Sequence, residues 1–123
     1  MKSFSEFLRK ISRRLLLTPN RLKAIEALDP EHIYVENVRS ILGLPTGLAK
    51  GLCELAVKRG ILERRIEVLC PDWVVAAEAP NEELLPAEVT CWKEVNGNYE
   101  ETLYPTAHLQ KMEFYVFKPE VAA

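Results

Sequence analysis

The chain has 123 residues, 48% of them apolar, with 16 basic and 18 acidic side chains. A chain of this size forms one ordinary domain or two very small ones, and it needs no disulfide scaffold to be stable. Its three cysteines are too few for a disulfide-rich secreted fold. No apolar run approaches the roughly 20 residues of a membrane span, and Arg13 and Arg14 interrupt any signal-peptide core. We therefore expect a soluble, cytoplasmic protein of a reducing compartment, with its cysteines reduced.

Charge is distributed unevenly along the chain. Residues 1–23 contain seven basic side chains and one acidic one, whereas residues 61–123 contain five basic and twelve acidic ones. Affinity for phosphate comes from clustered Lys and Arg. We therefore expect any nucleic-acid contact to use the first segment.

Two helices are predicted in the first 28 residues. Ser3 followed by Glu6 is typical of a capping box and predicts a helix to about residue 17. Thr18 and Pro19 predict the N-cap and first residue of a short second helix. The first helix has an apolar face and a basic face. The apolar face consists of Phe4, Phe7, Leu8, Ile11 and Leu15, and the basic face consists of Arg9, Lys10, Arg13 and Arg14. The basic face is either exposed to solvent without a binding role or a surface that binds an acidic partner, a phosphate backbone or anionic lipid. The apolar residues Phe4, Phe7 and Leu8 are also candidates for a homodimer contact.

Residues 32–79 predict an ordered series of short elements. The expected elements are a β-like run over 32–35, a helix over 35–42 ended by Gly43, a helix over 47–59 capped by Thr46 and ended by Gly60, and strands over 61–69 and 73–77. With the preceding helix, this order resembles the winged-helix fold, a helix-turn-helix variant with a β wing, over about residues 20–79. The stretch Val38 to Leu62 carries the resemblance.

In winged-helix proteins that bind DNA, the second helix of the motif enters the major groove. The side chains expected to face outward from that helix are Lys50, Gly51, Glu54, Val57 and Lys58, and the wing adds Arg64 and Arg65 beside Glu63 and Glu67. Such a surface reads bases poorly, because Glu54 repels phosphate. The resemblance thus implies a winged helix used for protein interaction, with DNA binding as the alternative.

Two cysteines stand at the spacing of a zinc ribbon. Cys70 begins the tetrapeptide that ends at Trp73, Cys91 begins the one that ends at Glu94, and 17 residues separate Trp73 from Cys91. A zinc ribbon places cysteine at all four positions, so residues 66–117 resemble a degenerate ribbon in which half of the ligands are lost. We expect no metal and no cofactor, with an apolar plug at Trp73 or two small buried cysteines. Cys53 is expected on the buried face of its helix.

The remaining residues predict a small antiparallel module. Strands are expected over 89–95 and 99–103, joined at Asn96-Gly97, followed by a turn or short helix over 105–109 and a last strand over 114–117. Catalysis is not expected, because His32 and His108 are isolated and nothing in the sequence brings His108 to Cys91.

The sequence thus predicts an α+β protein with N-terminal helices over 1–28, a winged-helix-like core over 29–79 and a small β module over 80–123, ribbon-like together with 66–79. We expect a non-enzymatic adaptor or accessory subunit that binds a protein partner; small proteins of this organisation resemble accessory components of bacterial multi-gene systems, including defence loci. The candidate binding residues for a protein or nucleic acid are Arg9, Lys10, Arg13, Arg14, Lys50, Lys58, Arg64 and Arg65.

Overall fold

The computed structural model describes residues 2–11 and 17–118, with mixed α+β architecture and antiparallel sheets. The chain divides into two compact units. The helical unit contains the residues up to Arg64 and those from Phe114 onward, and the β unit contains Arg65–Glu113. The last strand therefore returns to the unit in which the chain began.

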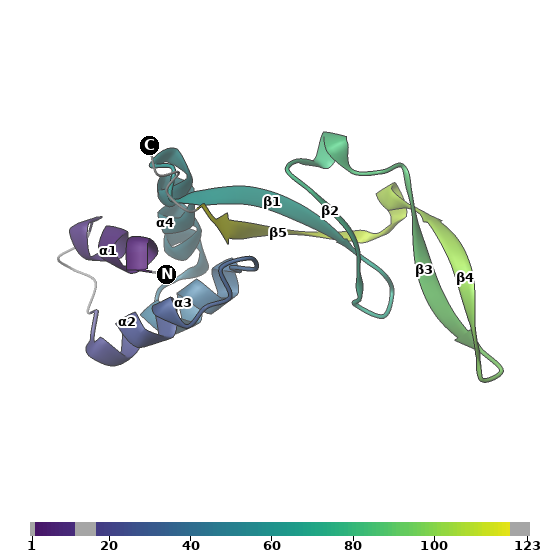
Figure 1. Ribbon diagram of the computed structural model, residues 1–123, viewed down its shortest axis with the longest axis horizontal. Coiled ribbons are helices and arrows are strands. Elements are labelled where there is room, and N and C mark those ends of the chain that lie inside the picture. The colour runs from purple at the N-terminus through teal and green to yellow at the C-terminus, as the bar shows by residue number, and fades with distance from the viewer. Residues whose placement is uncertain (1, 12–16, 119–123) are drawn as a thin grey trace. The chain divides into compact units, whose positions relative to one another are not determined.

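The helical unit contains four α-helices within the described residues (Figure 1). Their bounds are α1 Lys2–Ile11, α2 Pro19–Glu26, α3 Val35–Leu42 and α4 Thr46–Lys58. The predicted continuation of the first helix, with Arg13 and Arg14, lies outside the described residues. The other three helices fall within two residues of their predicted bounds.

The ends of these helices follow local backbone chemistry. The Thr18 hydroxyl oxygen accepts a hydrogen bond from the backbone N–H of Arg21 at 3.2 Å, which confirms the predicted N-cap of α2. Gly43 ends α3 in the left-handed conformation, with φ of 64°, as predicted. The predicted cap at Thr46 is wrong. Pro45 occupies the N-cap of α4 and Thr46 is already helical, because the fixed φ of proline suits the extended residue before a helix.

The core of the helical unit is formed by apolar side chains from all four helices and from the last strand. Fully buried members include Phe4, Leu8, Ile25, Val38, Ala49, Cys53 and Tyr115. The predicted apolar face of α1 is therefore confirmed as a packing face, while Arg9 and Lys10 are exposed. Because Phe4, Phe7 and Leu8 are at most 6% exposed, they are not available as a homodimer contact.

Two backbone hydrogen bonds join Ile33 to Tyr115. Each residue donates its N–H to the carbonyl oxygen of the other at 2.8 Å, which forms an isolated antiparallel bridge. Tyr115 belongs to β5 (Gln110–Phe117), the last strand. The predicted β-like run near Ile33 is thus a single bridge, because β5 meets it at one residue pair.

Three strands form one antiparallel sheet in the order β2-β1-β5, with β1 at Leu62–Leu69 and β2 at Val75–Ala79 (Figure 1). β1 pairs with β2 from Ile66↔Ala79 to Leu69↔Val75. β2 begins two residues later than the sequence predicts, because Trp73 lies in the turn with φ of 68°, a left-handed conformation that a strand does not contain. The second sheet is the hairpin of β3 (Glu88–Val95) and β4 (Asn98–Pro105).

Among the described residues, no single helix is both long and apolar enough to cross a membrane. Helices α3 and α4 reach that length and hydropathy only as a pair, and their axes bend by 114° at the break between them.

Candidate functional site

The β3–β4 hairpin turns at Asn96 and Gly97, as the sequence predicts. Both residues have positive φ, 52° and 81°, which a two-residue type I′ turn requires. The turn sets an uninterrupted register that runs from Val95↔Asn98 to Glu88↔Pro105. Successive side chains of each strand therefore point to opposite faces of the hairpin.

The inner face of the hairpin packs into the core of the β unit at its base, whereas Lys93 and Glu100 of the same face, nearer the turn, are exposed. Val89 and Cys91 on β3 are 5% and 2% exposed. They form a cluster with Val68 and Cys70, and Tyr104 on β4 packs against it. This buried face explains the alternation of buried and exposed residues at the start of β3.

The outer face of the hairpin consists of exposed side chains, and we use this name for Thr90, Trp92, Glu94, Tyr99, Glu101 and Leu103. The exposed fractions of Trp92, Tyr99 and Leu103 are 58%, 71% and 66%. Within the described parts of the chain, eight of the nine large hydrophobic side chains that are most exposed belong to the β unit. The most exposed large hydrophobic side chains are therefore concentrated in the β unit.

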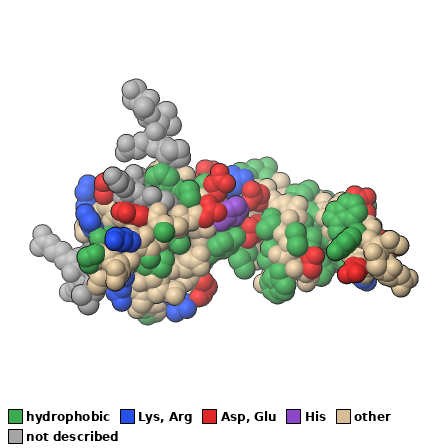
Figure 2. All heavy atoms as spheres, turned by 60° about the horizontal axis from the view of Figure 1, so that its bottom comes forward, with side chains coloured by type: hydrophobic (Ala, Val, Ile, Leu, Met, Phe, Trp, Pro, Cys, Tyr) green, Lys and Arg blue, Asp and Glu red, His purple; other side chains and the backbone are tan. Residues whose placement is uncertain are grey.

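Acidic side chains accompany this apolar surface. The β unit contains three basic and ten acidic residues, a net charge of −7, whereas the residues of the helical unit sum to +5 from 13 basic and 8 acidic ones. In the space-filling view, Lys and Arg gather over the helices, and hydrophobic and acidic side chains predominate over the hairpin (Figure 2). The exposed surface of the β unit is therefore acidic as well as apolar.

A hollow of about 470 Å³ lies in the β unit beside β3. Trp92, Glu94 and Tyr99 of one face of the hairpin line it, together with Cys91, Lys93 and Tyr104 of the other face and with Pro71 and Asp72. Lys93 stands opposite Glu100 in the register of the hairpin. The two aromatic rings and the Glu94 carboxylate therefore border the same concave space.

The cysteines of the β unit form a disulfide. Cys70, directly after β1, is bonded to Cys91 on β3, with their Cα atoms 5.8 Å apart. Both residues are buried, as expected, but the expectation of two reduced cysteines is wrong, because their sulfur atoms are bonded to each other.

The four positions of the expected degenerate ribbon do not face a common point. Glu94 lies on the outer face, opposite in direction to Cys91 on the same strand. Trp73 is 65% exposed, so the expectation that it acts as an apolar plug is wrong. Its left-handed backbone in the tight turn after Cys70 directs the ring to solvent.

The predicted basic residues divide into paired and exposed ones. Arg64 on β1 donates to both carboxylate oxygens of Glu54 on α4, with Nε 3.1 Å from Oε1. Glu54 also accepts a hydrogen bond of 2.8 Å from the hydroxyl of the buried Tyr115. Glu54 was expected to face away from the core; it lies instead against β1 and β5 because these two donors hold it there.

Electrostatics follow from this cluster. The hydrogen bonds from Arg64, and then from Tyr115, hold the pKa of Glu54 below its ordinary value despite partial burial. Burial and the Glu54 carboxylate raise the pKa of Tyr115. Burial, and then the charge of Glu54, raises the pKa of Cys53 to about 12. The cluster is thus the ionised Glu54 carboxylate paired with the Arg64 guanidinium, beside the neutral Tyr115 hydroxyl and Cys53 thiol, and these contacts stabilise the fold.

The other basic candidates lie at the surface of their elements. Arg9 and Lys10 end α1, and Lys50 and Lys58 are exposed on α4, eight positions and so about 12 Å apart along its axis. Arg65 is half-buried on β1. Val57, expected to face outward, is half-buried against the core. Helix α4 therefore offers only two cations on its exposed side among the predicted residues.

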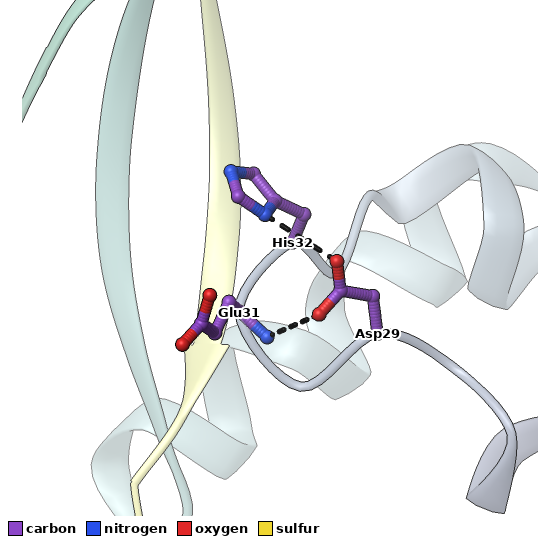
Figure 3. A group of neighbouring side chains, drawn as sticks. All are labelled: Asp29, Glu31 and His32. Atoms are coloured by element: carbon purple, nitrogen blue, oxygen red, sulfur yellow. Dashed lines mark hydrogen bonds and ion pairs between the residues drawn. The ribbon is translucent and has the colours of Figure 1, made fainter.

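Asp29, Glu31 and His32 bring three potential metal-ligating atoms within 4.8 Å of one another (Figure 3). Both oxygens of Asp29 are already engaged, one by the backbone N–H of Glu31 at 3.0 Å and one by Nδ1 of His32 at 3.5 Å. The His32 ring also stacks on Phe114 with the ring centroids 5.1 Å apart. These contacts explain why the three side chains lie close together: they belong to a turn that its own side chains stabilise.

His108 was weighed in the sequence as a base for Cys91. It lies in the 3-10 helix Thr106–His108 and lines a hollow of about 220 Å³ together with Cys70 and Trp73. The sulfur atoms of Cys70 and Cys91 are bonded to each other, so in this state His108 has no thiol there to activate.

Sequence reasoning missed the outer face, although the signal was present. The Asn96-Gly97 turn fixes the register, and with Cys91 directed inward, strand alternation places Trp92, Tyr99 and Leu103 together on the other side.

Comparison with known proteins gives no match: no protein-family model, no curated protein and no solved structure matches this chain.

Proposed function

We propose that this chain is a non-enzymatic protein-interaction module, an adaptor or accessory subunit, built on a winged helix. What supports the winged-helix part is the order of elements in the helical unit. Helix α2 is followed by the bridge at Ile33, helices α3 and α4, and strand β1, and the bridge pairs with β5, which neighbours β1. In this proposal, the residues that separate β1 from β5 in the sequence, which belong to the β unit, form a greatly enlarged wing.

The outer face of the hairpin carries this proposal. Trp92, Tyr99 and Leu103 are each more than half exposed, and they project from a two-stranded sheet whose other face is buried at Val89 and Cys91 and crosslinked there. Trp and Tyr are enriched among the residues that contribute most to the binding energy of protein interfaces, because they bury a large area with few rotatable bonds. The packing and the disulfide restrain the base of the hairpin, which lowers the entropy lost there when a partner binds.

The test is capture from the native host with the tagged protein, with and without nuclease. We expect a stoichiometric protein partner that survives nuclease and is lost when Trp92→Ser and Leu103→Ser are combined. The matched control is Leu84→Ser, which removes a side chain that is 64% exposed in the same unit but away from the hairpin. Equal capture by all three proteins would overturn the proposal.

The second candidate function is DNA binding by the winged helix. What favours it is the net charge of +5 carried by the residues of the helical unit, with Arg9, Lys10, Lys50 and Lys58 exposed. What weighs against it is that the Arg64 guanidinium is bound to Glu54. Affinity for duplex DNA should fall steeply with salt if this candidate is right, and charge reversal at Lys50 and Lys58 should abolish it. Nucleic acid in the captured material, with partners lost after nuclease, would reverse the ranking.

A further inference from the structure

Aromatic and acidic side chains alternate in a square on the outer face of the hairpin. The register pairs Trp92 with Glu101 and Glu94 with Tyr99, and these two pairs are neighbours on the same face. The two rings therefore occupy one diagonal of the square and the two carboxylates the other. Cβ atoms directly opposite one another are about 5 Å apart, and those on a diagonal about 7 to 8 Å.

A cation fits the centre of such a square better than any neutral group. An ammonium or guanidinium group is attracted to the faces of Trp and Tyr rings, and it forms charge-assisted hydrogen bonds with carboxylates. All four side chains are exposed, so none of them has to be uncovered before a ligand binds.

We infer that the outer face binds an extended segment of a protein partner through a lysine or arginine side chain held between Trp92 and Tyr99. Charge complementarity decides the class of partner: a unit with a net charge of −7 repels nucleic acid and acidic surfaces and attracts basic segments. Leu103 extends the apolar side of the surface next to Trp92 and suits an aliphatic neighbour of the cation. This inference rests on the proposed function and specifies the partner.

The test uses the full chain and a synthetic peptide of alternating glycine and arginine. Trp73→Phe leaves Trp92 as the single tryptophan, because the chain has two, and its fluorescence then reports on the outer face. We expect saturable binding that weakens as salt rises, and at least tenfold weaker binding when arginine is replaced by neutral citrulline. Glu94→Gln with Glu101→Gln should also weaken binding at least tenfold.

The matched control is Glu82→Gln with Glu83→Gln, which removes the same charge from exposed positions of the β unit outside the hairpin. We expect this control to change the affinity less than twofold. Equal weakening by both double variants would mean diffuse attraction of charge and would overturn the inference, as would undiminished binding of the citrulline peptide.

Two further measurements separate this inference from its alternatives. If sedimentation equilibrium without peptide shows self-association that Glu94→Gln with Glu101→Gln abolishes, the occupant is a second copy of this chain and a separate partner is excluded. If the partner captured from the host is lost with the Trp92 and Leu103 variant but retained by the Glu94 and Glu101 variant, the proposed function stands and the cationic contact is wrong. Loss of the captured partner with both variants supports both the proposed function and the cationic contact.

Discussion

The hydroxyl of Tyr115 on β5 donates a hydrogen bond of 2.8 Å to Glu54 on α4, across 61 residues of sequence. Arg64 on β1 donates to the same carboxylate, so one acidic side chain holds a helix and two strands together. A hydrogen bond to a charged group contributes about 1.5 to 3 kcal/mol to stability. Glu54 thus links α4 to β1 and β5 and stabilises the helical unit.

Tyr115→Phe removes this hydroxyl and leaves the ring in the core. We expect the free energy of unfolding to fall by about 1 to 2 kcal/mol in urea titrations, because Arg64 still accompanies the carboxylate. Tyr99→Phe removes a hydroxyl from an exposed ring and should change stability by less than about 0.5 kcal/mol. Equal losses in the two variants would contradict the role given to Tyr115.

Acid should weaken the helical unit through Glu54. The hydrogen bonds from Arg64 and Tyr115 lower the pKa of Glu54 from its ordinary value of 4.5. A carboxyl group whose pKa is lower in the folded protein contributes stability above its ordinary pKa, and this stability is lost as the pH falls through the lower, folded value. We expect unfolding experiments between pH 7 and pH 3 to show a steeper loss for the native chain than for Glu54→Gln. Parallel pH profiles would exclude Glu54 as the responsible group.

Alanine substitutions at two glycines should change the stability of the chain in opposite directions. Gly43 has φ of 64°, and an added Cβ would lie 3.3 Å from the Arg21 guanidinium, so Gly43→Ala should destabilise the chain by about 1 to 2 kcal/mol. Gly51 lies inside α4 with open space around it, so Gly51→Ala should stabilise by about 0.5 to 1 kcal/mol. Thermal unfolding of the two variants measures both effects, and a shift of the same sign in both would be inconsistent with these backbone conformations.

The disulfide should stabilise the β unit. It joins residues 21 positions apart, and closing a loop of that length contributes about 3 kcal/mol in the chain-entropy model. We expect Cys70→Ser with Cys91→Ser to lower the stability of residues 65–113 selectively, as measured by amide hydrogen exchange. Uniform loss of protection in both units would contradict two separate cores. The comparison variant is Cys53→Ser, which alters only the helical unit.

Cys53 should be chemically inert. It is fully buried, and its pKa is raised to about 12, so almost no thiolate exists near neutral pH. We expect iodoacetamide at pH 8 to leave the folded, oxidised chain unmodified in mass spectrometry. After denaturation without reductant, one thiol should react. Modification of the folded chain at the rate of the denatured one would show that the helical unit opens readily.

Local signals predicted most of the elements correctly. Thr18, Gly43 and the Asn96-Gly97 turn act through a few neighbouring backbone groups, so their effects can be read from the residues themselves. Thr46 shows the limit of such reasoning. Two adjacent residues, Pro45 and Thr46, were both suitable for the N-cap of α4, and the structure places Pro45 there.

Interactions between distant residues were not predictable in this way. Glu54 was expected to face solvent because nothing in the helix pattern shows that Tyr115, 61 residues later, returns as its donor. The bond between Cys70 and Cys91 was missed because their spacing resembles that of metal ligands, and spacing alone does not distinguish the two uses of a thiol. To predict the outer face, one further step was needed: the Asn96-Gly97 turn sets the register, and the alternation of side chains along β3 then determines which side chains of β4 lie on the same face.

The return of β5 has a consequence for how the protein is made. The bridge between Ile33 and Tyr115 means that the first core to be synthesised is also the last to be completed. Until Tyr115 has been synthesised, Ile33 lacks the backbone partner of its bridge and the helical core lacks one of its fully buried side chains. Helices that form before that point therefore leave part of their apolar surface uncovered, and the last strand covers it.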